Sequence, residues 1–388
     1  MSYQPRIVVV GAGIIGLSTA YALLKGGRQK VTVLEQAAVD HKQGSSHGFS
    51  RLLRFEYGAD RLYSEMVRLS LRRWQELEQK TGASLYTPTG VLVLGNQQDG
   101  FTQQAYTLLR ESGVPVRQLS KQQCQQRFPQ FNTEEYDYFT YNSLGGILHA
   151  STCLRQLRTL LSERGAVIRE NCRVIKIDES RPGHPLRLGL SSGEILEADR
   201  VVLAVGGWVH KLLPEFRLPI RLTRQYLLYF AGLPTSMYQS EIFPSFLARD
   251  LYGFPIHAGC NGWLKVSSHT FGPPVEPDEK ARVDEQAIAH TQQQILELLP
   301  DLSRATLARI DSCMYDVTPD EHFILDRLPA EPRIIIAAGL SGHAFKFGPL
   351  LGEMLGALVC DTKPPVPMER FRLTRFPQTV KQLVHSAA

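Results

Sequence analysis

Long hydrophobic runs are absent from this sequence of 388 residues. No stretch approaches the eighteen or so apolar residues that a membrane-spanning helix needs. The apolar residues near the N-terminus are interrupted by glycines and lack a small-residue cleavage site after them, which is unlike a signal peptide. We therefore expect a soluble, cytoplasmic protein without a membrane partner.

Cysteine is scarce, and the six cysteines that occur are widely scattered. Their low density argues against a disulfide scaffold, and the lack of a C-x-x-C pair argues against a metal or redox site of that kind, so we expect no bound metal. The net charge of +5 is small and dispersed, with no basic tract interleaved with aromatic residues. Nucleic acid is therefore not an expected partner, whereas a weakly positive cleft for an anionic substrate is compatible with this charge.

Repeats, low-complexity tracts and long linkers are also missing. Hydrophobic residues make up 43% of the chain and charged residues 21%, which are ordinary proportions for a globular protein. A chain of this length can bury a large core and form two domains, or three. Because no linker divides the sequence, we expect domains that are interwoven rather than sequential.

The stretch 6–36 has the pattern of a β-α-β unit. An apolar run leads into Gly11, Gly13 and Gly16 at G-x-G-x-x-G spacing, a helical pattern follows, and a second apolar run ends at Glu35. The glycines permit a tight turn, the close approach of a pyrophosphate and helix–strand packing, and the helix N-terminus attracts phosphate. Glu35 is placed to accept the hydroxyls of an adenosine ribose, and no Arg or Lys follows it directly to favour a 2′-phosphate. The unit therefore predicts FAD or NAD rather than NADP.

Periodicity predicts the remaining elements. We expect helices at 59–80, at two places within 97–128, at 151–163 and at 283–298, with a capping box formed by Ser120 and Gln123. We expect a strand at 86–95, a three-stranded meander at 167–177, 186–190 and 195–206, a β-rich segment at 218–268, and a strand, glycine turn and helix at 333–355. The loop 44–58 is rich in glycine and serine, and its His and Arg side chains need a partner.

Three strands run into glycine turns, at Gly11, Gly206 and Gly339. This arrangement suggests one sheet that presents several backbone turns to one extended ligand, which FAD fits better than the shorter NAD. The helix that follows Ser341 and Gly342 is expected to aim its N-terminus at the pyrimidine end of the flavin, where negative charge develops on reduction.

Two residues on predicted strands have alternative interpretations. Cys313 shares a face with Tyr315, opposite Met314, and composition alone favours a buried structural cysteine. Lys265 shares a face with His269, and composition alone favours a solvated lysine. A lysine that faced a flavin would instead stabilise the superoxide formed when reduced flavin meets dioxygen.

Three further cations have candidate roles. Arg51 and Arg54 are three positions apart, as on adjacent turns of a short helix, and the alternative is that they are exposed surface arginines. Lys346 follows the expected helix start at Gly342, a place that cations usually avoid. Its position suggests an anionic neighbour, either a substrate carboxylate or the reduced flavin.

Taken together, these features resemble the monomeric sarcosine oxidase family of flavin amine oxidases, which includes N-methyltryptophan oxidase and pipecolate oxidase. The resemblance rests on GAGIIG, GSSHGFSRLLRFEYG, TGVLVLG, LYGFP, GWLKVSSHTFG, SCMYDVTPDEHFILD and AAGLSGHAFKFGP, in the family's order and at similar spacing through almost the whole chain. It implies an α/β protein in which a Rossmann-type FAD-binding domain, of the glutathione-reductase-like kind, is interwoven with a β-rich (α+β) substrate domain. We expect residues 1–82, 146–216 and 320–388 in the FAD-binding domain, and 83–145 and 217–319 in the substrate domain.

The resemblance also implies roles for individual residues. Cys313 would bond through its sulfur to the 8α-methyl group of FAD, Lys265 would activate oxygen, and Arg54 and Lys346 would hold the substrate carboxylate. The implied catalytic residues are Lys265, Arg51, His269 and Tyr315, and Tyr252 would join His269 and Tyr315 in lining the substrate pocket. Arg51 and His47 would lie against the flavin ring, and the full set expected to bind FAD is Gly11, Gly13, Ile14, Ile15, Gly16, Glu35, Gln36, Ser46, His47, Ser50, Arg51, Val174, Gly206, Trp208, Cys313, Met314, Gly339, Gly342, His343, Phe345 and Lys346.

The implied reaction is the oxidation of the C–N bond of a secondary, N-methyl or cyclic, amino acid to an imine by a monomeric enzyme, with reduction of O2 to hydrogen peroxide. Two departures leave the substrate open, because the family's sarcosine enzymes carry threonine where Ser50 stands and a small residue near Trp263. Two other functions remain as alternatives. One is an amino acid dehydrogenase of the same fold with a protein or quinone as electron acceptor, and the other is a non-catalytic flavoprotein subunit.

Overall fold

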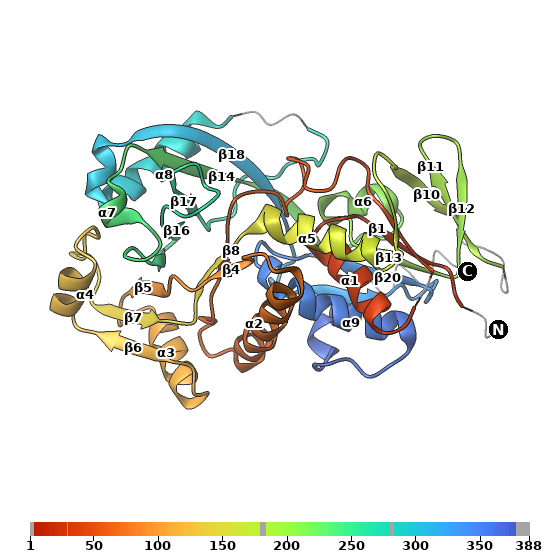
Figure 1. Cartoon of the computed structure of the whole chain (residues 1–388), viewed down its shortest axis with the longest axis horizontal. Coiled ribbons are helices and arrows are strands. Elements are labelled where there is room, and N and C mark those ends of the chain that lie inside the picture. Colours follow the sequence, from red (N-terminus) through yellow and green to blue (C-terminus); the bar gives the residue numbers. More distant parts are fainter. Residues whose placement is uncertain (1–3, 29, 179–183, 280–282, 378–388) are drawn as a thin grey trace.

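Two large sheets organise the chain in the computed structural model, which describes residues 4–28, 30–178, 184–279 and 283–377 (Figure 1). The first sheet has six strands in the order β19-β20-β13-β1-β2-β9. Its members are β1 (Ile7–Val10), β2 (Val31–Leu34), β9 (Val167–Arg169), β13 (Arg200–Leu203), β19 (Ile324–Arg327) and β20 (Ile334–Ala338). All neighbours in this sheet are parallel except β19, which runs antiparallel to β20.

Helices cover one face of this sheet. They are α1 (Ile14–Lys25), α2 (Arg61–Thr81), α5 (Ala150–Glu163) and α9 (Gly348–Cys360), and α1 packs against both α5 and α9. Side chains on β1 alternate, so that Ile7 and Val9 join the core under these helices while Val8 and Val10 join the core on the opposite face. A strand buried on both faces explains the continuous apolar run in the sequence.

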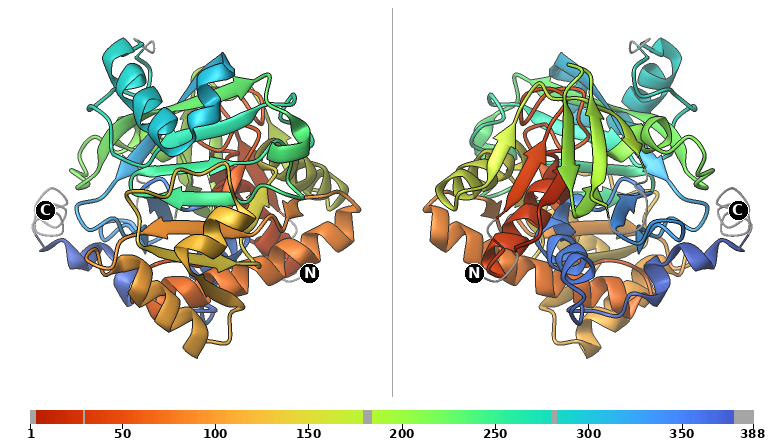
Figure 2. Two further views of the ribbon diagram at one scale, coloured as in Figure 1. Left: turned by 90° about the vertical axis from the view of Figure 1, so that its left-hand side faces the viewer. Right: turned by 90° about the vertical axis from the view of Figure 1, so that its right-hand side faces the viewer.

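A three-stranded antiparallel sheet covers the opposite face of the six-stranded sheet, together with the short helix α6 (Val209–Leu212) (Figure 2). It consists of β10 (Val174–Asp178), β11 (Leu186–Leu190) and β12 (Ile195–Ala198). The expected meander at 167–206 is therefore correct only in its middle part. The beginning of the first run is β9 and the end of the last is β13, and both belong to the six-stranded sheet, where parallel neighbours satisfy their backbone hydrogen bonds.

The second large sheet has eight strands in the order β18-β14-β17-β16-β15-β5-β7-β6. Its members are β5 (Val91–Gly95), β6 (Val116–Leu119), β7 (Tyr138–Asn142), β14 (Arg221–Ala231), β15 (Ser245–Ala248), β16 (Leu251–Phe254), β17 (Leu264–Ser268) and β18 (Thr306–Val317). The nearby helices are α3 (Phe101–Glu111), α4 (Lys121–Arg127), α7 (Thr235–Tyr238) and α8 (Glu285–Leu298), and the predicted capping box of Ser120 and Gln123 is present at α4. In Figure 1 the long strand β18 runs from the part that holds α7 and α8 toward the middle of the molecule.

The loop 44–58 contains a short strand rather than a helix. Strand β3 (Arg51–Leu53) pairs with β8 (Gly146–Leu148), which also pairs with β4 (Tyr86–Thr87). The interpretation of Arg51 and Arg54 as residues on adjacent helical turns is therefore wrong, because β8 offers the backbone of β3 a sheet partner. The strand expected at 86–95 is likewise divided into β4 and β5, which belong to different sheets.

The chain alternates between the two large sheets. The six-stranded sheet draws on residues 7–34, 167–203 and 324–338, and the eight-stranded sheet draws on residues 91–142 and 221–317. This alternation agrees with the expected α/β class and interwoven architecture. Within the described ranges, no helix is long and apolar enough to cross a bilayer.

Candidate active site

The turn after β1 forms one end of the site. Gly11 has a φ of +98°, and a Cβ on Gly16 would lie 1.9 Å from the carbonyl oxygen of Gly11, so the turn requires glycine at both positions. The backbone N–H of Ala12 donates to Glu35 Oε2 (2.8 Å), and that of Ile14 donates to Ser46 Oγ (3.0 Å). Glu35 thus closes the β-α-β unit at the position that the fingerprint predicts, although both of its oxygens already accept backbone hydrogen bonds, Oε2 from Ala12 and Oε1 from Ala37 (3.1 Å).

Three glycine turns meet at one edge of the six-stranded sheet. Strands β1, β13 and β20 are adjacent and parallel, so their carboxyl ends, followed by Gly11, Gly206 and Gly339, lie on the same side. Gly206 and Gly339 have φ values of +52° and +59°. This arrangement confirms that one sheet edge presents several backbone turns.

A cavity of about 410 Å³ extends from this edge to the eight-stranded sheet. Its lining includes residues of the first turn, of loop 40–54, and of β14, β16 and β18. The predicted site residues on its wall are Gly11, Gly13, Ile14, Ile15, Glu35, Gln36, Ser46, His47, Arg51, Arg54, Val174, Gly206, Trp208, Tyr252, His269, Cys313, Met314, Tyr315, Gly342, His343, Phe345 and Lys346. In the described part of the chain, Gly16, Ser50, Lys265 and Gly339 are the predicted site residues that do not line it.

Cys313 lines the cavity from β18 and is half-buried. Burial raises the pKa of its thiol, while the nearby positive charges of Arg51 and Lys265 act in the opposite direction. Cations of this kind favour the thiolate, the form in which cysteine is nucleophilic. The interpretation as a fully buried structural cysteine therefore does not hold.

Arg51 is fixed by the loop that precedes it. Its guanidinium donates to the carbonyl oxygens of Ser45 (2.8 Å), His47 (2.6 Å) and Ser50 (2.9 Å) and lies 5.7 Å from the ring centroid of Phe345. Because these acceptors are neutral, the positive charge of Arg51 is not cancelled by an ion pair with them. The interpretation of Arg51 as a free surface residue is wrong.

Arg54 and Lys346 place two cations on the same wall of the cavity. The Arg54 guanidinium lies 4.4 Å from the ring centroid of Tyr57, and its Nη1 is buried without a hydrogen-bond partner among the described residues. Lys346 is 4% exposed, and its Nζ donates to the carbonyl oxygen of His343 (2.8 Å). Burial lowers the pKa of Lys346 well below its usual value, Arg54 lowers it further, and the buried Glu56 opposes both effects. An anion in the cavity would relieve this repulsion.

Lys346 lies in a short 3₁₀ turn, η3 (Phe345–Phe347), directly before α9. The helix therefore begins later than expected at Gly342. The intervening backbone is a tight turn, in which Ser341 and Gly342 have φ values of +48° and +70°.

Lys265 does not line the cavity, but it interacts electrostatically with Arg51 and Cys313, which do. It is 1% exposed, its Nζ donates to the carbonyl oxygen of Ser50 (3.0 Å), and it lies 4.8 Å from the ring centroid of Phe254. Burial lowers its pKa to about 7, and the charge of Arg51 adds to this effect. The interpretation of Lys265 as a solvated lysine is therefore wrong.

Tyr252, Tyr315 and His269 line the cavity together with Arg54, and the ring centroids of Tyr252 and His269 are 6.2 Å apart. The two tyrosine hydroxyls are 3.5 Å apart, and burial raises the pKa of both. Burial lowers the pKa of His269 to about 4, with further contributions from Arg54 and Lys346. His269 is therefore neutral at pH 7.

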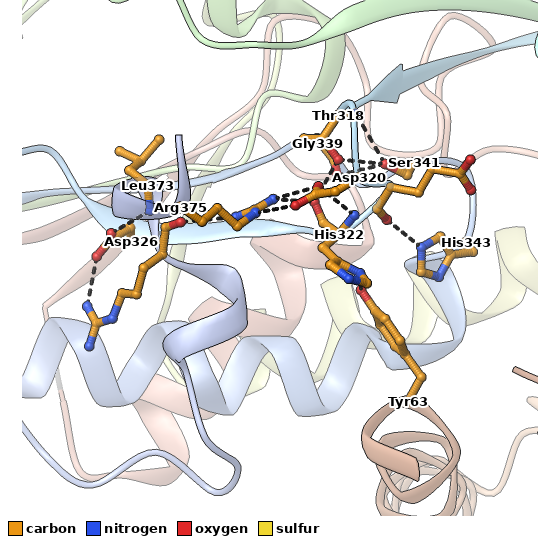
Figure 3. Close-up of polar contacts among 12 residues, drawn as sticks. Tyr63, Thr318, Asp320, His322, Asp326, Gly339, Ser341, His343, Leu373 and Arg375 are labelled. Carbon is orange, nitrogen blue, oxygen red and sulfur yellow. Dashed lines mark hydrogen bonds and ion pairs between the residues drawn. The ribbon is translucent and has the colours of Figure 1, made fainter. Parts of the chain in front are cut away.

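A polar network holds the glycine turn after β20 (Figure 3). The Ser341 hydroxyl donates to the carbonyl oxygen of Gly339 (3.1 Å) and lies 3.4 Å from that of Thr318, which donates to the carbonyl oxygen of His322 (2.8 Å). Arg375, from the C-terminal segment, binds Asp320 in the same region (2.8 Å). The C-terminal segment thereby stabilises the turn that carries Gly342 and leads to Lys346.

Sequence reasoning missed several residues of the cavity wall. Leu227 and Leu247 add apolar surface, and Asp316 adds an acid. Asp316 was detectable as a single charged residue within the apolar end of β18. Trp263, singled out as a departure from the family, packs against Phe49 and does not line the cavity in the described part of the chain.

The residues present fit an elongated dinucleotide such as FAD. Gly13 keeps the turn open, since a Cβ there would lie 3.1 Å from Ser46 Oγ. Buried polar atoms on the wall, Arg54 Nη1, His41 Nδ1 and Asp316 Oδ2, have no partner among the described residues. These atoms have no accessible surface, so the fit to FAD rests instead on the open glycine turns and on a cavity that extends from the first turn to the eight-stranded sheet.

Comparisons with known proteins agree with this geometry. The family model described as "FAD dependent oxidoreductase" matches residues 6–358. The peroxisomal sarcosine oxidase of Homo sapiens is 33% identical over 386 residues, with 96% of this chain and 97% of that protein covered. The monomeric sarcosine oxidase of Bacillus sp. (strain B-0618) is 32% identical over 386 residues, with 97% of each covered.

Among solved structures, the L-proline dehydrogenase from P. horikoshii has a TM-score of 0.84 at 20% identity, with 97% of this chain and 99% of that chain covered, a likeness of fold. The two sarcosine oxidases and the family model extend over nearly the whole sequence. The chain therefore belongs to the FAD-dependent oxidoreductase family and, within it, to the monomeric sarcosine oxidase family.

Proposed function

We propose that the protein is an FAD-dependent oxidase of a secondary amino acid, which it converts to an imine while O2 is reduced to hydrogen peroxide. The observation that carries this proposal is the pair of cations, Arg54 and Lys346, on the wall of the cavity that fits FAD. Paired cations beside an apolar surface suit a substrate with one carboxylate. The sarcosine oxidases to which the chain is similar act, by their names, on an N-methyl amino acid.

When bound, FAD supplies the redox chemistry, since it accepts a hydride equivalent from the amine and passes two electrons to dioxygen. In our proposal Arg54 and Lys346 bind the substrate carboxylate and thereby orient the amine, which gives the rate advantage of a fixed geometry. Tyr252, Tyr315 and the neutral His269 line the substrate pocket and exclude water. Arg51 and Lys346 supply positive charge where the reduced flavin would be anionic.

Lys265 is our candidate for the oxygen-activating residue. Its burial keeps water from screening its charge, and its pKa of about 7 leaves a substantial cationic fraction at neutral pH. A cation in such a site stabilises negative charge that develops on dioxygen. The proposal is supported by its place next to Arg51 and Cys313, with which it interacts electrostatically.

The proposed function is tested by mixing the purified protein with secondary amino acids in air. We expect bleaching of the flavin without oxygen and release of hydrogen peroxide with it, and screening several such amino acids would identify the substrate. Bleaching without peroxide would favour the dehydrogenase alternative. A flavin that no secondary amino acid bleaches would favour the non-catalytic alternative.

We further propose that Cys313 is bonded to FAD. The parent protein, precipitated with acid, should keep its flavin colour in the pellet, and a Cys313→Ala variant should release it to the supernatant. Cys124→Ala, at a buried cysteine of the eight-stranded sheet's core, is the matched control and should retain the colour. Release of colour from the parent protein would contradict the covalent bond but not the binding of FAD.

The domain division, the cellular location and the oligomeric state complete the proposal. The FAD-binding domain comprises residues 1–82, 146–216 and 320–388, and the substrate domain comprises 83–145 and 217–319. We also propose that the protein acts as a cytoplasmic monomer. Support for the monomer comes from the name of the similar Bacillus enzyme.

A further inference from the structure

Asp40 is an acid on the cavity wall to which the proposed reaction gives no role. Its side chain is 11% exposed, and each of its carboxylate oxygens already has a protein partner. Oδ1 accepts from the hydroxyl of Ser151 (2.7 Å) and lies 2.8 Å from Nδ1 of His47, and Oδ2 accepts from Nη1 of Arg155 (3.1 Å). Of these three partners, His47 is the one that lines the cavity.

The carboxylate of Asp40 has a defined charge and place. Burial raises its pKa, but the hydrogen bonds from His47 and Ser151 and the charge of Arg155 outweigh this effect and keep the pKa below its usual value. The backbone at Asp40 has a φ of +67°, which residues other than glycine seldom adopt, although Asp tolerates it better than most. Because Ser151 and Arg155 both belong to α5, this strained residue is fixed against the start of a helix.

The carboxylate determines which nitrogen of His47 carries a proton. A carboxylate only accepts hydrogen bonds, so Nδ1 of His47 must be protonated to bind it. The opposite nitrogen, Nε2, has no hydrogen-bond partner in the described part of the chain and is not one of its inaccessible polar atoms. The side chain of His47 is 26% exposed and lines the cavity. Nε2 is therefore the ring nitrogen that a ligand in the cavity can reach.

His47 lies between the first glycine turn and the residues near Cys313. The residue before it, Ser46, accepts from the N–H of Ile14 at that turn (3.0 Å). The carbonyl oxygen of His47 accepts from the guanidinium of Arg51 (2.6 Å), which interacts electrostatically with Cys313. A dinucleotide with its pyrophosphate at the glycine turn and its flavin ring at Cys313 would bring its central oxygen atoms past this stretch.

We propose that Asp40 is a positioning residue of the cofactor site, which holds the His47 ring so that Nε2 forms a hydrogen bond with an oxygen atom in the central part of FAD. That oxygen belongs to the ribityl chain or to the pyrophosphate. The neutral ring accepts from a ribityl hydroxyl, and the doubly protonated ring donates to a phosphate oxygen. The proposal rests on FAD binding, which the family establishes, and on the orientation given by the proposed bond to Cys313, but not on the identity of the substrate.

The test measures the dissociation constant of FAD, by flavin fluorescence, in full-length Cys313→Ala protein, in which no bond between this residue and the flavin can form. Asp40→Gly removes the carboxylate without straining the backbone, because glycine adopts a positive φ freely. We expect FAD binding to weaken about 2- to 10-fold, as for the loss of one ordinary hydrogen bond. His47→Asn, whose amide replaces Nδ1 but leaves no atom at the place of Nε2, should weaken binding by a similar factor.

The double variant separates positioning from a merely structural role. If Asp40 acts through Nε2 of His47, adding Asp40→Gly to His47→Asn should weaken FAD binding no further. If Asp40 instead acts by fixing the loop to α5, its removal should weaken binding by the same factor in both backgrounds. That additive result would overturn the proposal, as would an unchanged FAD affinity in the single Asp40→Gly variant.

Arg155→Met is the matched control, because it removes another partner of Asp40 and leaves the contact with His47. The Arg155 side chain is 61% exposed, and an exposed ion pair contributes little, so FAD binding should stay unchanged. Weaker FAD binding in this variant would assign the effect to the ion pair with α5 and contradict the proposal.

ADP identifies the oxygen atom that His47 contacts, because it carries the pyrophosphate but no ribityl chain. An ADP affinity that Asp40→Gly leaves unchanged, while FAD binding weakens, assigns the contact to the ribityl chain. An ADP affinity that falls by the same factor assigns it to the pyrophosphate. All these measurements are made without substrate, so a negative result would leave the amine oxidase function intact.

Discussion

Replacing Lys265 with methionine is expected to slow the reoxidation of reduced flavin by O2 about 10²- to 10³-fold, the usual effect of removing one preorganised electrostatic group. Anaerobic reduction of the flavin by substrate should remain nearly intact. The reason is that Lys265 is buried behind the cavity wall, held by the carbonyl oxygen of Ser50, and does not line the cavity. Stopped-flow absorbance, with the two half-reactions measured separately, provides the test.

The pH dependence of reoxidation gives an independent check on Lys265. Its pKa is lowered to about 7, so the side chain is a cation below that pH and loses its proton as the pH rises through it. The reoxidation rate of the parent protein should therefore fall above pH 7, and the methionine variant should lack this dependence. Lys121→Met, at a partly exposed lysine that is paired with Glu134 and does not line the cavity, is the matched control. Equal slowing of both half-reactions would refute the oxygen-site assignment.

Replacing Arg54 with glutamine is expected to weaken the binding of an amino acid substrate about 10- to 100-fold, because one hydrogen bond between charged groups is lost. The measurement is the substrate concentration dependence of anaerobic flavin reduction. An amine without a carboxylate should bind the parent protein and the variant equally, which separates loss of the clamp from general damage. An unchanged affinity for the carboxylate substrate would count against the clamp.

The same Arg54→Gln variant should not be less stable than the parent protein in the absence of ligand. Arg54 lowers the pKa of Lys346, and its Nη1 has no partner among the described residues, so its removal relieves repulsion and an unsatisfied group. Two cations that bind a substrate carboxylate are expected to destabilise the folded protein when no substrate is bound. A large drop in the melting temperature would indicate that Arg54 is mainly structural.

Much of the fold was predictable because the signals are local. The β-α-β unit at 6–36, the capping box at Ser120 and the strands that end at Gly11, Gly206 and Gly339 depend on side-chain periodicity and glycine spacing within short windows. These predictions are confirmed. The family resemblance extended them to the α/β class and to FAD.

Other features depend on partners that are distant in the sequence. Residues 51–53 form a strand because residues 146–148 pair with them. The apolar runs at 167–177 and 195–206 are each divided into two strands, because the two ends of each run belong to different sheets. No local pattern contains this information. The roles assigned to the individual site residues stay predictions, although the structure gathers most of them on one cavity wall.

By itself, the sequence determined the dinucleotide unit, the family and the residue types available for chemistry, because glycine spacing and motif order are properties of the chain alone. The tertiary structure alone decided which of these side chains are buried and which charges they meet. Lys265 and Lys346 look like ordinary lysines in the sequence, and packing removes both from water and lowers their pKa values.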